Sequence, residues 1–234
     1  MFGFYADEIS QVKLWRTIQD YSAVNSCRAG GFVSSLLPLF PLEAVLLPGV
    51  PFPLHIFEPR YKEMIGECLA EQTPFGVVRS QDEGVSEIGC TAEILAVTKK
   101  HPDGKLDIVT QGKRRFEVLE VNQERSFLRA EVLYIDDEGA QPTQAEVEHA
   151  LKLHAEIMGL AGADPDLPDS EPGTLAFRMA GTLPLDLDFK QALLAMRSEA
   201  KRVQTVITYF ETLLPNLRRA VRVKHKASGN GHGH

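Results

Sequence analysis

One four-residue stretch, Ser198-Glu-Ala-Lys201, has the spacing of a nucleophile and the amine that activates it. In some serine acyltransferases a lysine one helical turn after the serine helps to remove the hydroxyl proton. The accompanying motifs of those enzymes, Ser-Asp-Asn and Lys-Thr-Gly, do not occur in this sequence. A serine at a helix start also accepts a hydrogen bond from a free backbone N–H group. We therefore expect Ser198 to cap a helix, and we predict no catalytic residue.

The two Gly-Lys dipeptides of the chain, Gly104-Lys105 and Gly112-Lys113, do not have the form of a phosphate-binding loop. They are followed by Leu and Arg rather than by Ser or Thr, and neither has the upstream glycine that a P-loop requires. We expect both dipeptides at turns between strands. ATP hydrolysis by this chain is not predicted.

The histidines and the acidic loop give no metal-binding pattern. His149 and His154 are five residues apart, which is not the i, i+4 spacing of the HExxH motif. We expect an ordinary helix with one half-buried histidine, and we take His232 and His234 in the glycine-rich tail as no site. The acidic residues that follow depart from the spacing of a calcium loop and are interleaved with prolines: Asp164, Asp166, Asp169 and Glu171. We expect a solvated linker there, and we predict no metal and no cofactor.

Two basic clusters lie in a chain that is acidic as a whole. Lys113-Arg114-Arg115 is the first, and the second consists of Arg218, Arg219, Arg222, Lys224 and Lys226. The second cluster falls at a helix end, where cations favour the helix dipole. It has no interleaved aromatic residues for stacking bases, and the net charge is −7 with a pI of about 5.5. We therefore predict no nucleic-acid partner.

The segment from Leu36 to Arg79 determines the first elements, because it holds six of the fourteen prolines of the chain between Pro38 and Pro59. Interior prolines exclude a single long helix. The pattern predicts short extended pieces at 37–40 and 44–49, with bends at Pro48-Gly49 and at 51–53. A helix then begins at Pro59, and its apolar face consists of Tyr61, Met64, Ile65, Cys68 and Leu69. A buried strand is expected at 75–79.

Residues 91–137 change to a period of two, which is typical of strands. The turn sequence His101-Pro-Asp-Gly104 separates 91–100 from 105–112 and predicts a hairpin. A second pair is expected between 114–121 and 127–135, and a further short strand at 85–90. The short connections favour mostly antiparallel pairing in a curled sheet or an open barrel.

From residue 138 onward the pattern is helical. Thr143 and Glu146 form a capping box for a helix over 141–159. Further helices are expected at 174–183, from an Asp188 cap to residue 196, and after Ser198. The predicted organisation is a peripheral extension (1–34), a β-rich domain (35–139), an all-α helical subdomain (140–222) and a flexible basic tail (223–234).

Composition agrees with a folded α+β protein of the cytoplasm. Hydrophobic residues make up 44% and charged residues 24% of the chain. The three cysteines form no CxxC pair, which indicates a reducing compartment. A run of about 18 apolar residues does not occur, and Asp7 and Glu8 stand where a signal peptide would be basic. We predict neither a membrane span nor a membrane partner.

Several segments together carry a family resemblance. They are LPLFPLEAVLLPGVPFPLHIFEPRY, FGVV, VSEIGCTAEILAVTKKHPDGKLDIVTQGKRRFEV and LRAEVLYIDD, followed by PGTLAFRMAGTLPLDLDFKQALLAMRSEAKRVQTVITYF. This pattern, from Leu36 to Leu217, resembles the N-terminal substrate-binding domain of the Lon proteases. The resemblance implies a β pseudo-barrel with one early helix, then a helical subdomain, and a role in recognising unfolded or tagged proteins. The ATPase and peptidase modules of Lon have no counterpart in this sequence, so we expect a stand-alone, non-catalytic module.

Three functions remain open at this stage. The first is a non-catalytic protein that binds peptides or client proteins and acts as an adaptor to a separate ATP-dependent protease, with apolar surface around Phe52, Phe57 and Tyr61. The second is a small-molecule enzyme with a site between the β and α parts, which would need titratable groups such as His55, Glu58 and Arg60 in a pocket. The third is a structural module that forms a homo-oligomer. The sequence assigns no substrate-binding residue.

Overall fold

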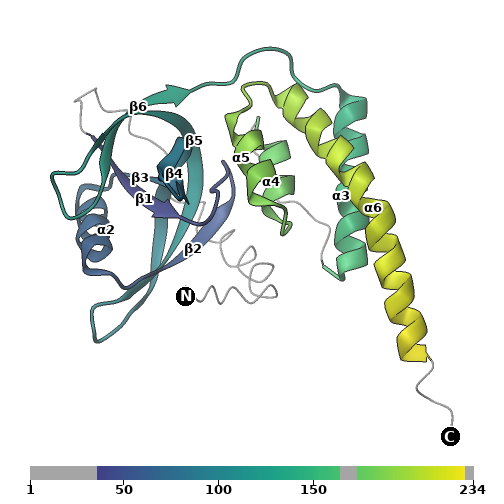
Figure 1. Ribbon diagram of the computed structural model, residues 1–234, viewed down its shortest axis with the longest axis horizontal. Coiled ribbons are helices and arrows are strands. Elements are labelled where there is room, and N and C mark those ends of the chain that lie inside the picture. The colour runs from purple at the N-terminus through teal and green to yellow at the C-terminus, as the bar shows by residue number, and fades with distance from the viewer. Residues whose placement is uncertain (1–35, 164–172, 230–234) are drawn as a thin grey trace, which may run out of the picture.

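The computed structural model describes residues 36–163 and 173–229, which form a β part followed by a helical part (Figure 1). The expectations for residues 1–34 and for the acidic loop from Asp164 to Glu171 lie outside the described residues. The β part lies at one side of the molecule, and the long last helix lies at the other side (Figure 1). The predicted α+β class is confirmed.

Six strands form the β part, in the order β2-β5-β4-β3-β1-β6, with an additional pairing between β5 and β6. Their bounds are β1 Leu37–Leu42, β2 Pro51–Ile56, β3 Phe75–Gln81, β4 Gly84–Lys100, β5 Leu106–Asn122 and β6 Arg129–Ile135. The β5–β6 pairing closes five strands into a ring, while β2 pairs only with the first half of β5. Bulges interrupt β4 and β5, and only two residue pairs join β1 to β6. The result is a pseudo-barrel rather than a regular barrel.

Helix α2 (Pro59–Glu71) follows β2 and leads into β3, which pairs with β1 in the only parallel pair among the described strands. Pro59 occupies the first turn, as predicted, since a residue there has no helical partner for an N–H group. The helix buries Tyr61, Met64, Ile65 and Cys68, and the Tyr61 ring lies 4.1 Å from that of Phe40. Leu69, which was expected on the same apolar face, is exposed.

The proline-rich segment was predicted wrongly in detail. Residues 44–49 form no regular strand, and the strand β2 lies where a bend was expected, over Pro51 and Pro53. Both prolines fit because β2 has a partner strand on one side only. Residues i and i+2 of a strand direct their backbone nitrogen atoms to the same side. For Pro51 and Pro53 this is the side of β2 that has no partner strand. The prolines therefore remove no hydrogen bond from the ladder.

Strands β4 and β5 are also longer than predicted, because the breaks expected near Cys90 and at Gly112-Lys113 do not occur. The hairpin between them is confirmed: Lys100 pairs with Leu106 around the turn. Gly112 lies inside β5, where the backbone of Pro48 forms a bridge to it. A Cβ atom at position 112 would lie 2.2 Å from the carbonyl oxygen of Leu47. This glycine therefore marks a close approach of two backbones and not a turn.

The helical part consists of α3 (Gln144–Ala161), α4 (Leu175–Gly181), α5 (Leu187–Ala195) and α6 (Glu199–Gly229). Helices α3 and α6 run side by side, and α4 and α5 lie between them and the β part (Figure 1). The capping box of Thr143 and Glu146 is confirmed. The predicted Asp188 cap is wrong, because Asp186 accepts hydrogen bonds from the N–H groups of Asp188 and Phe189. Asp188 lies in the first turn of α5 instead, where it pairs with Arg79 of β3.

A continuous apolar core joins the two parts. It includes Phe40 and Ile65 from the β part and Leu193 and Phe210 from the helices. The amide of Gln191 on α5 adds a hydrogen bond of 2.9 Å to the carbonyl oxygen of Ile88 on β4. None of the helices in 36–163 and 173–229 combines the length and apolar character needed to span a bilayer.

Candidate functional site

A groove of about 510 Å³ lies along α5 and α6. Its lining consists of aromatic and aliphatic side chains alternating with small polar ones: Phe189, Thr205, Thr208, Tyr209, Thr212 and Leu213, with Asn216 at one end. Volumes of about 300–1,000 Å³ are usual for sites that bind small molecules or a few side chains. The groove is therefore large enough for two or three side chains of a bound chain.

The floor of the groove is an aromatic pair. The rings of Phe189 and Tyr209 have centroids 4.1 Å apart, and both residues are half-buried. They pack against the apolar core, so that folding itself holds them in place. Such a pair offers an apolar surface to side chains of a ligand.

The wall of the groove is a row of threonine hydroxyls on α6. Thr205, Thr208 and Thr212 each donate to the carbonyl oxygen four residues earlier, at 2.8, 3.0 and 2.9 Å. With the proton used in this way, each hydroxyl oxygen still accepts hydrogen bonds. The wall can therefore receive N–H groups of an extended backbone. Apart from Tyr209, none of the lining residues carries a titratable side chain.

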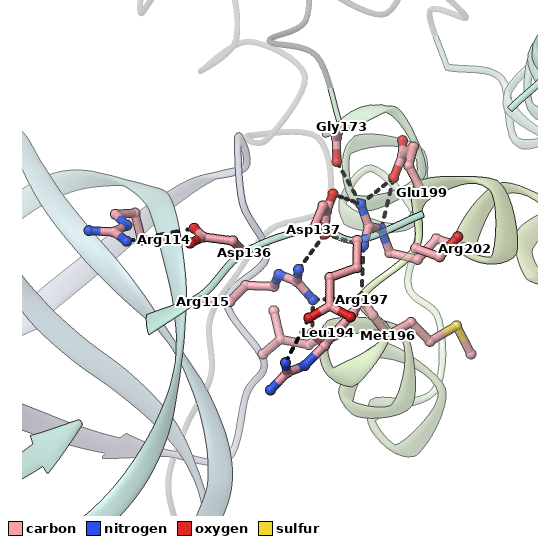
Figure 2. A network of polar contacts seen from close by, with 12 residues as sticks. Arg114, Arg115, Asp136, Asp137, Gly173, Leu194, Met196, Arg197, Glu199 and Arg202 are labelled. Carbon is pink, nitrogen blue, oxygen red and sulfur yellow. Dashed lines mark hydrogen bonds and ion pairs between the residues drawn. The ribbon is translucent and has the colours of Figure 1, made fainter. Parts of the chain in front are cut away.

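The position of α5 and α6 relative to the β part depends on a buried polar network (Figure 2). Arg115 of β5 donates to the carbonyl oxygens of Leu194 and Met196, at 2.9 and 2.6 Å. Arg115 also forms an ion pair with Asp137, which follows β6. The Arg115 side chain is 4% exposed, so these partners replace nearly all of its hydration.

Arg202 of α6 completes the network from the other side. It forms an ion pair with Asp137, and it lies 2.6 Å from a carboxylate oxygen of Glu199. It also donates to the carbonyl oxygens of Met196 and Gly173 at 2.8 and 3.0 Å. Figure 2 shows the two carboxyl groups lying on different sides of the Arg202 guanidinium.

The electrostatics of the network follow from the number of partners that each group has. Burial lowers the pKa of Arg115, and the single carboxylate of Asp137 only opposes this shift. Burial acts in the same direction on Arg202, but hydrogen bonds and charges from Asp137 and Glu199 outweigh it and raise the pKa of Arg202. Burial raises the pKa of Glu199, and Arg202 opposes that shift. Two guanidinium groups thus face two carboxyl groups, and the network joins the β part to α5 and α6.

The structure separates the residues that the sequence placed in candidate sites. Ser198 accepts a hydrogen bond from the N–H group of Lys201 at 3.4 Å, which confirms its role as a cap. His154 is buried and bonded to Thr182 at 2.8 Å, whereas His149 is exposed and lies 2.9 Å from Glu211. These two histidines share no ligand position.

The first basic cluster does not form a common surface. Lys113 pairs with Glu93 at 3.3 Å, and Arg114 lies 3.9 Å from the centre of the Tyr134 ring. Arg115, in contrast, is buried in the network. In the second cluster, Arg218 pairs with Glu156 at 2.6 Å.

The residues suggested for peptide or small-molecule binding lie near the start of α2, away from the groove. Of the three aromatic residues, Tyr61 is buried, Phe52 is half-buried, and Phe57 is 47% exposed. Glu58 and Arg60 form an exposed pair at 2.8 Å. His55 is engaged with Asp107 at 2.5 Å.

Neither the groove nor the buried network was recognised from the sequence. The available signal for the groove was the spacing of Thr205, Thr208 and Thr212, which places three hydroxyls on one face of α6 beside Tyr209. No comparable sequence signal indicates the buried network, because Asp137 and Arg202 are 65 residues apart.

Comparison with known proteins places this chain in a family. The family model described as the ATP-dependent protease La (LON) substrate-binding domain matches residues 36–211, a range that includes β1 to β6 and the aromatic pair. A Lon protease of Flavobacterium johnsoniae is 27% identical over 201 residues, which cover 77% of this chain and 24% of that protein. A Lon protease of Parabacteroides distasonis is 30% identical over 125 residues, which cover 50% of this chain and 15% of that protein. This chain thus spans about a quarter or less of the length of these relatives.

Solved structures agree with the family match. The crystal structure of a Lon N-terminal domain protein from Xanthomonas campestris has a TM-score of 0.61 and 27% identity, and the match covers 75% of this chain and 98% of that one. The N-terminal domain of a Mycobacterium avium complex Lon protease has a TM-score of 0.60 at 20% identity, over 76% and 98% of the two chains. The second likeness concerns the fold alone.

Proposed function

Because this chain belongs to the family of Lon substrate-binding domains, we propose that it is a recognition module that binds exposed segments of polypeptide substrates. In this proposal it performs no chemistry itself and delivers its clients to a separate ATP-dependent protease. The cytoplasm is the compartment we propose, since both cysteines in the described residues, Cys68 and Cys90, are free thiols.

The observation that carries the proposal is the groove with the Phe189–Tyr209 pair, which lies inside the range matched by the family model. Unfolded polypeptides differ from folded ones in exposing large apolar side chains together with unpaired backbone N–H groups. The aromatic floor suits the side chains, and the hydroxyl row of Thr205, Thr208 and Thr212 suits the N–H groups.

The sheet supports the same choice of binding mode. Many recognition domains capture a peptide by adding it as a strand to an open sheet edge. In the described residues the outer strand of the order is β2, and its free side carries Pro51 and Pro53, which have no N–H groups to donate. Five of the six strands are closed into a ring. Binding through side chains in the groove is therefore favoured over strand addition.

The size of the groove limits the expected affinity. Complete burial of one large apolar side chain contributes about 1.5–3 kcal/mol, and the groove has room for two or three. After the entropic cost of ordering a flexible chain, the expected affinity is micromolar or weaker. Weak and sequence-tolerant binding suits a module that must also release its clients.

The test uses a fluorescently labelled, unfolded polypeptide, reduced casein, and measures its anisotropy on titration with this protein. Thr212→Arg places a long charged side chain in the groove without removing a core contact, because Thr212 is exposed. We expect this variant to weaken binding by roughly tenfold, the equivalent of about 1.4 kcal/mol. The matched control is Ala220→Arg, which adds the same charge at an exposed position of α6 outside the groove lining.

A second pair of variants locates the site. Tyr209→Ala removes half of the aromatic floor and should also weaken casein binding. Phe57→Ser changes the exposed aromatic residue near α2 and should not. If Phe57→Ser abolishes binding while the groove variants bind normally, the site lies at α2. Absence of casein binding by the unmodified protein would reject the proposed function.

The remaining functions are separated by activity and mass. The proposal predicts that the purified chain hydrolyses neither ATP nor casein, with Ser198→Ala indistinguishable from the unmodified protein. Casein turnover that Ser198→Ala abolishes would make the chain an enzyme. A stable oligomer that ignores casein, measured by native mass spectrometry, would instead indicate a structural assembly module.

A further inference from the structure

Three side chains with metal-ligating atoms meet at one end of the pseudo-barrel, far in sequence from the groove. His55 lies on β2, Asp107 near the start of β5, and His101 in the turn between β4 and β5. His55 and Asp107 are direct partners in the β2–β5 register. The backbone of His101 closes the turn. Its N–H group donates to the carbonyl oxygen of Lys105, and its carbonyl oxygen accepts from the N–H group of Gly104.

The carboxylate of Asp107 lies between the two imidazoles. One of its oxygens is 2.5 Å from Nδ1 of His55, and the other is 2.8 Å from Nε2 of His101. One ligand atom from each of the three residues lies within 4.8 Å of the other two. The imidazole rings are nearly perpendicular, at 84°, with centroids 5.6 Å apart. Their donor nitrogens therefore converge on one carboxylate from two directions.

We propose that His55, His101 and Asp107 form a binding site for a divalent transition ion of the zinc type. Two imidazole nitrogens and one carboxylate oxygen are a ligand set that Zn²⁺ takes readily, with water as the fourth ligand. Ligand bonds of about 2.0–2.2 Å in a tetrahedron place the donor atoms about 3.3 Å apart. The oxygens of Asp107 lie 2.5 and 2.8 Å from the two imidazole nitrogens, and no two of the three ligand atoms are more than 4.8 Å apart. Side-chain rotations therefore suffice to replace the shared hydrogen bonds by bonds to the ion.

The surroundings suit an accessible site that the fold holds in place. His55 is 51% exposed, Asp107 34% and His101 24%, which leaves room for a water ligand and for entry of the ion. The hydroxyl of Thr98 donates to the carbonyl oxygen of Asp107 at 3.1 Å, and the ladder of β5 fixes both neighbouring strands.

Two nearby cations, Lys105 of the turn and Lys62 of α2, have other partners. Lys105 pairs with the carboxylate of Asp103 at 2.7 Å, and Lys62 donates to the carbonyl oxygen of the same residue at 3.1 Å. The carboxylate of Asp107 therefore interacts with the two histidines. Their hydrogen bonds, first that of His55 and then that of His101, keep the pKa of Asp107 below its usual range. A bound ion would fasten the outer strand β2 to the β4–β5 turn.

The experiment measures zinc affinity by competition with a chromophoric chelator. To exclude any contribution from the tail histidines, His232 and His234 are first replaced by alanine to give a background chain. We expect one zinc ion per chain on this background, and a loss of affinity of roughly tenfold or more in His55→Ala and in His101→Ala. The matched control is His149→Ala, which removes another exposed histidine with a carboxylate partner, Glu211.

A second measurement guards against a folding defect in the variants. Co²⁺ bound by two imidazoles and a carboxylate gives visible absorption bands, and Asp107→Asn should diminish them while circular dichroism shows an unchanged fold. The proposal is overturned if the background chain binds no zinc, or if His149→Ala weakens binding as much as His101→Ala does. Neither result depends on polypeptide binding by the groove.

Discussion

Arg202 binds Asp137 through both oxygens of its carboxylate, with Nη1 2.8 Å from Oδ1 and Nη2 in contact with Oδ2. Arg202 is fully buried in α6, and Asp137 lies just after the last strand. Such two-point pairs fix orientation as well as distance. The junction between β6 and the helical part is therefore held by a charged contact inside the molecule, in addition to the shared apolar core.

The replacement Asp137→Asn is expected to destabilise the protein by about 3 kcal/mol or more. It keeps the shape of the side chain but leaves Arg115 without its carboxylate and Arg202 with one of two, both inside the protein. Urea unfolding followed by circular dichroism measures the change in the free energy of unfolding. The control is the neighbour Asp136→Asn, whose carboxylate is 88% exposed and 3.7 Å from Arg114; it should change stability by less than about 0.5 kcal/mol. Equal effects of the two variants would show that the network contributes no more than a surface pair.

Elements with local causes were predictable from the sequence. The start of α2 at Pro59, the capping box of Thr143 with Glu146, and the turn from His101 to Lys105 each depend on residues within six positions of one another. Their signals are hydrogen bonds or dihedral preferences that a short segment satisfies by itself. Each of these predictions is confirmed.

Features that depend on distant partners were missed or misread. Pro51 and Pro53 indicated a bend, and only the edge position of β2 makes them compatible with a strand. Asp188 and Asp186 are equally good caps by residue type, and Asp188 instead pairs with Arg79, more than a hundred residues away. Arg115 was assigned to a basic cluster, because its carboxylate partner, Asp137, lies 22 positions further along the chain.

Gly112→Ala is expected to cost about 1–3 kcal/mol, because the new methyl group would meet the backbone carbonyl of Leu47 at 2.2 Å, and backbone cannot rotate away. Gly66→Ala is the control. Gly66 lies inside α2 with no atom within 4 Å of an added Cβ, so that substitution should stabilise by about 0.5–1 kcal/mol through helix propensity. Thermal unfolding of both variants measures the difference. A neutral Gly112→Ala would mean that the segment 46–50 shifts freely over β5.

The two described cysteines are expected to resist thiol reagents. Burial raises the pKa of Cys68 to about 11 and that of Cys90 to about 12. Since only the thiolate reacts, the pKa shift alone slows reaction at pH 8 by roughly a hundredfold or more relative to an ordinary thiol. Reaction with a disulfide dye, in a Cys27→Ser background, should release little colour from the native protein and two equivalents after denaturation. Rapid reaction of the native protein would show that the core around α2 and β4 opens readily.

Acid is expected to destabilise the fold through His154. Burial lowers the pKa of His154 from its usual 6.5 to about 4. Its Nε2 bonds to the Thr182 hydroxyl, which itself donates to the carbonyl oxygen of Met179. Nε2 therefore carries the proton, and the buried Nδ1 has no partner. Between pH 6.5 and about pH 4 the imidazole of His154 is protonated in the unfolded chain but neutral in the folded chain. Stability should fall from about pH 6.5 down to about pH 4, by up to about 3 kcal/mol from this one group.

His154→Leu tests the origin of this acid sensitivity, because leucine fills the site without a titrating group. Urea unfolding between pH 7 and pH 4 should show a shallower loss of stability in this variant than in the unmodified protein. Thr182→Val is the matched control: it removes the hydrogen-bond partner of Nε2 but leaves the imidazole, so it should lower stability at every pH and keep the steep dependence. If His154→Leu and the unmodified protein lose stability in parallel over this range, the acid sensitivity arises from the carboxylates that are ion-paired in the folded state.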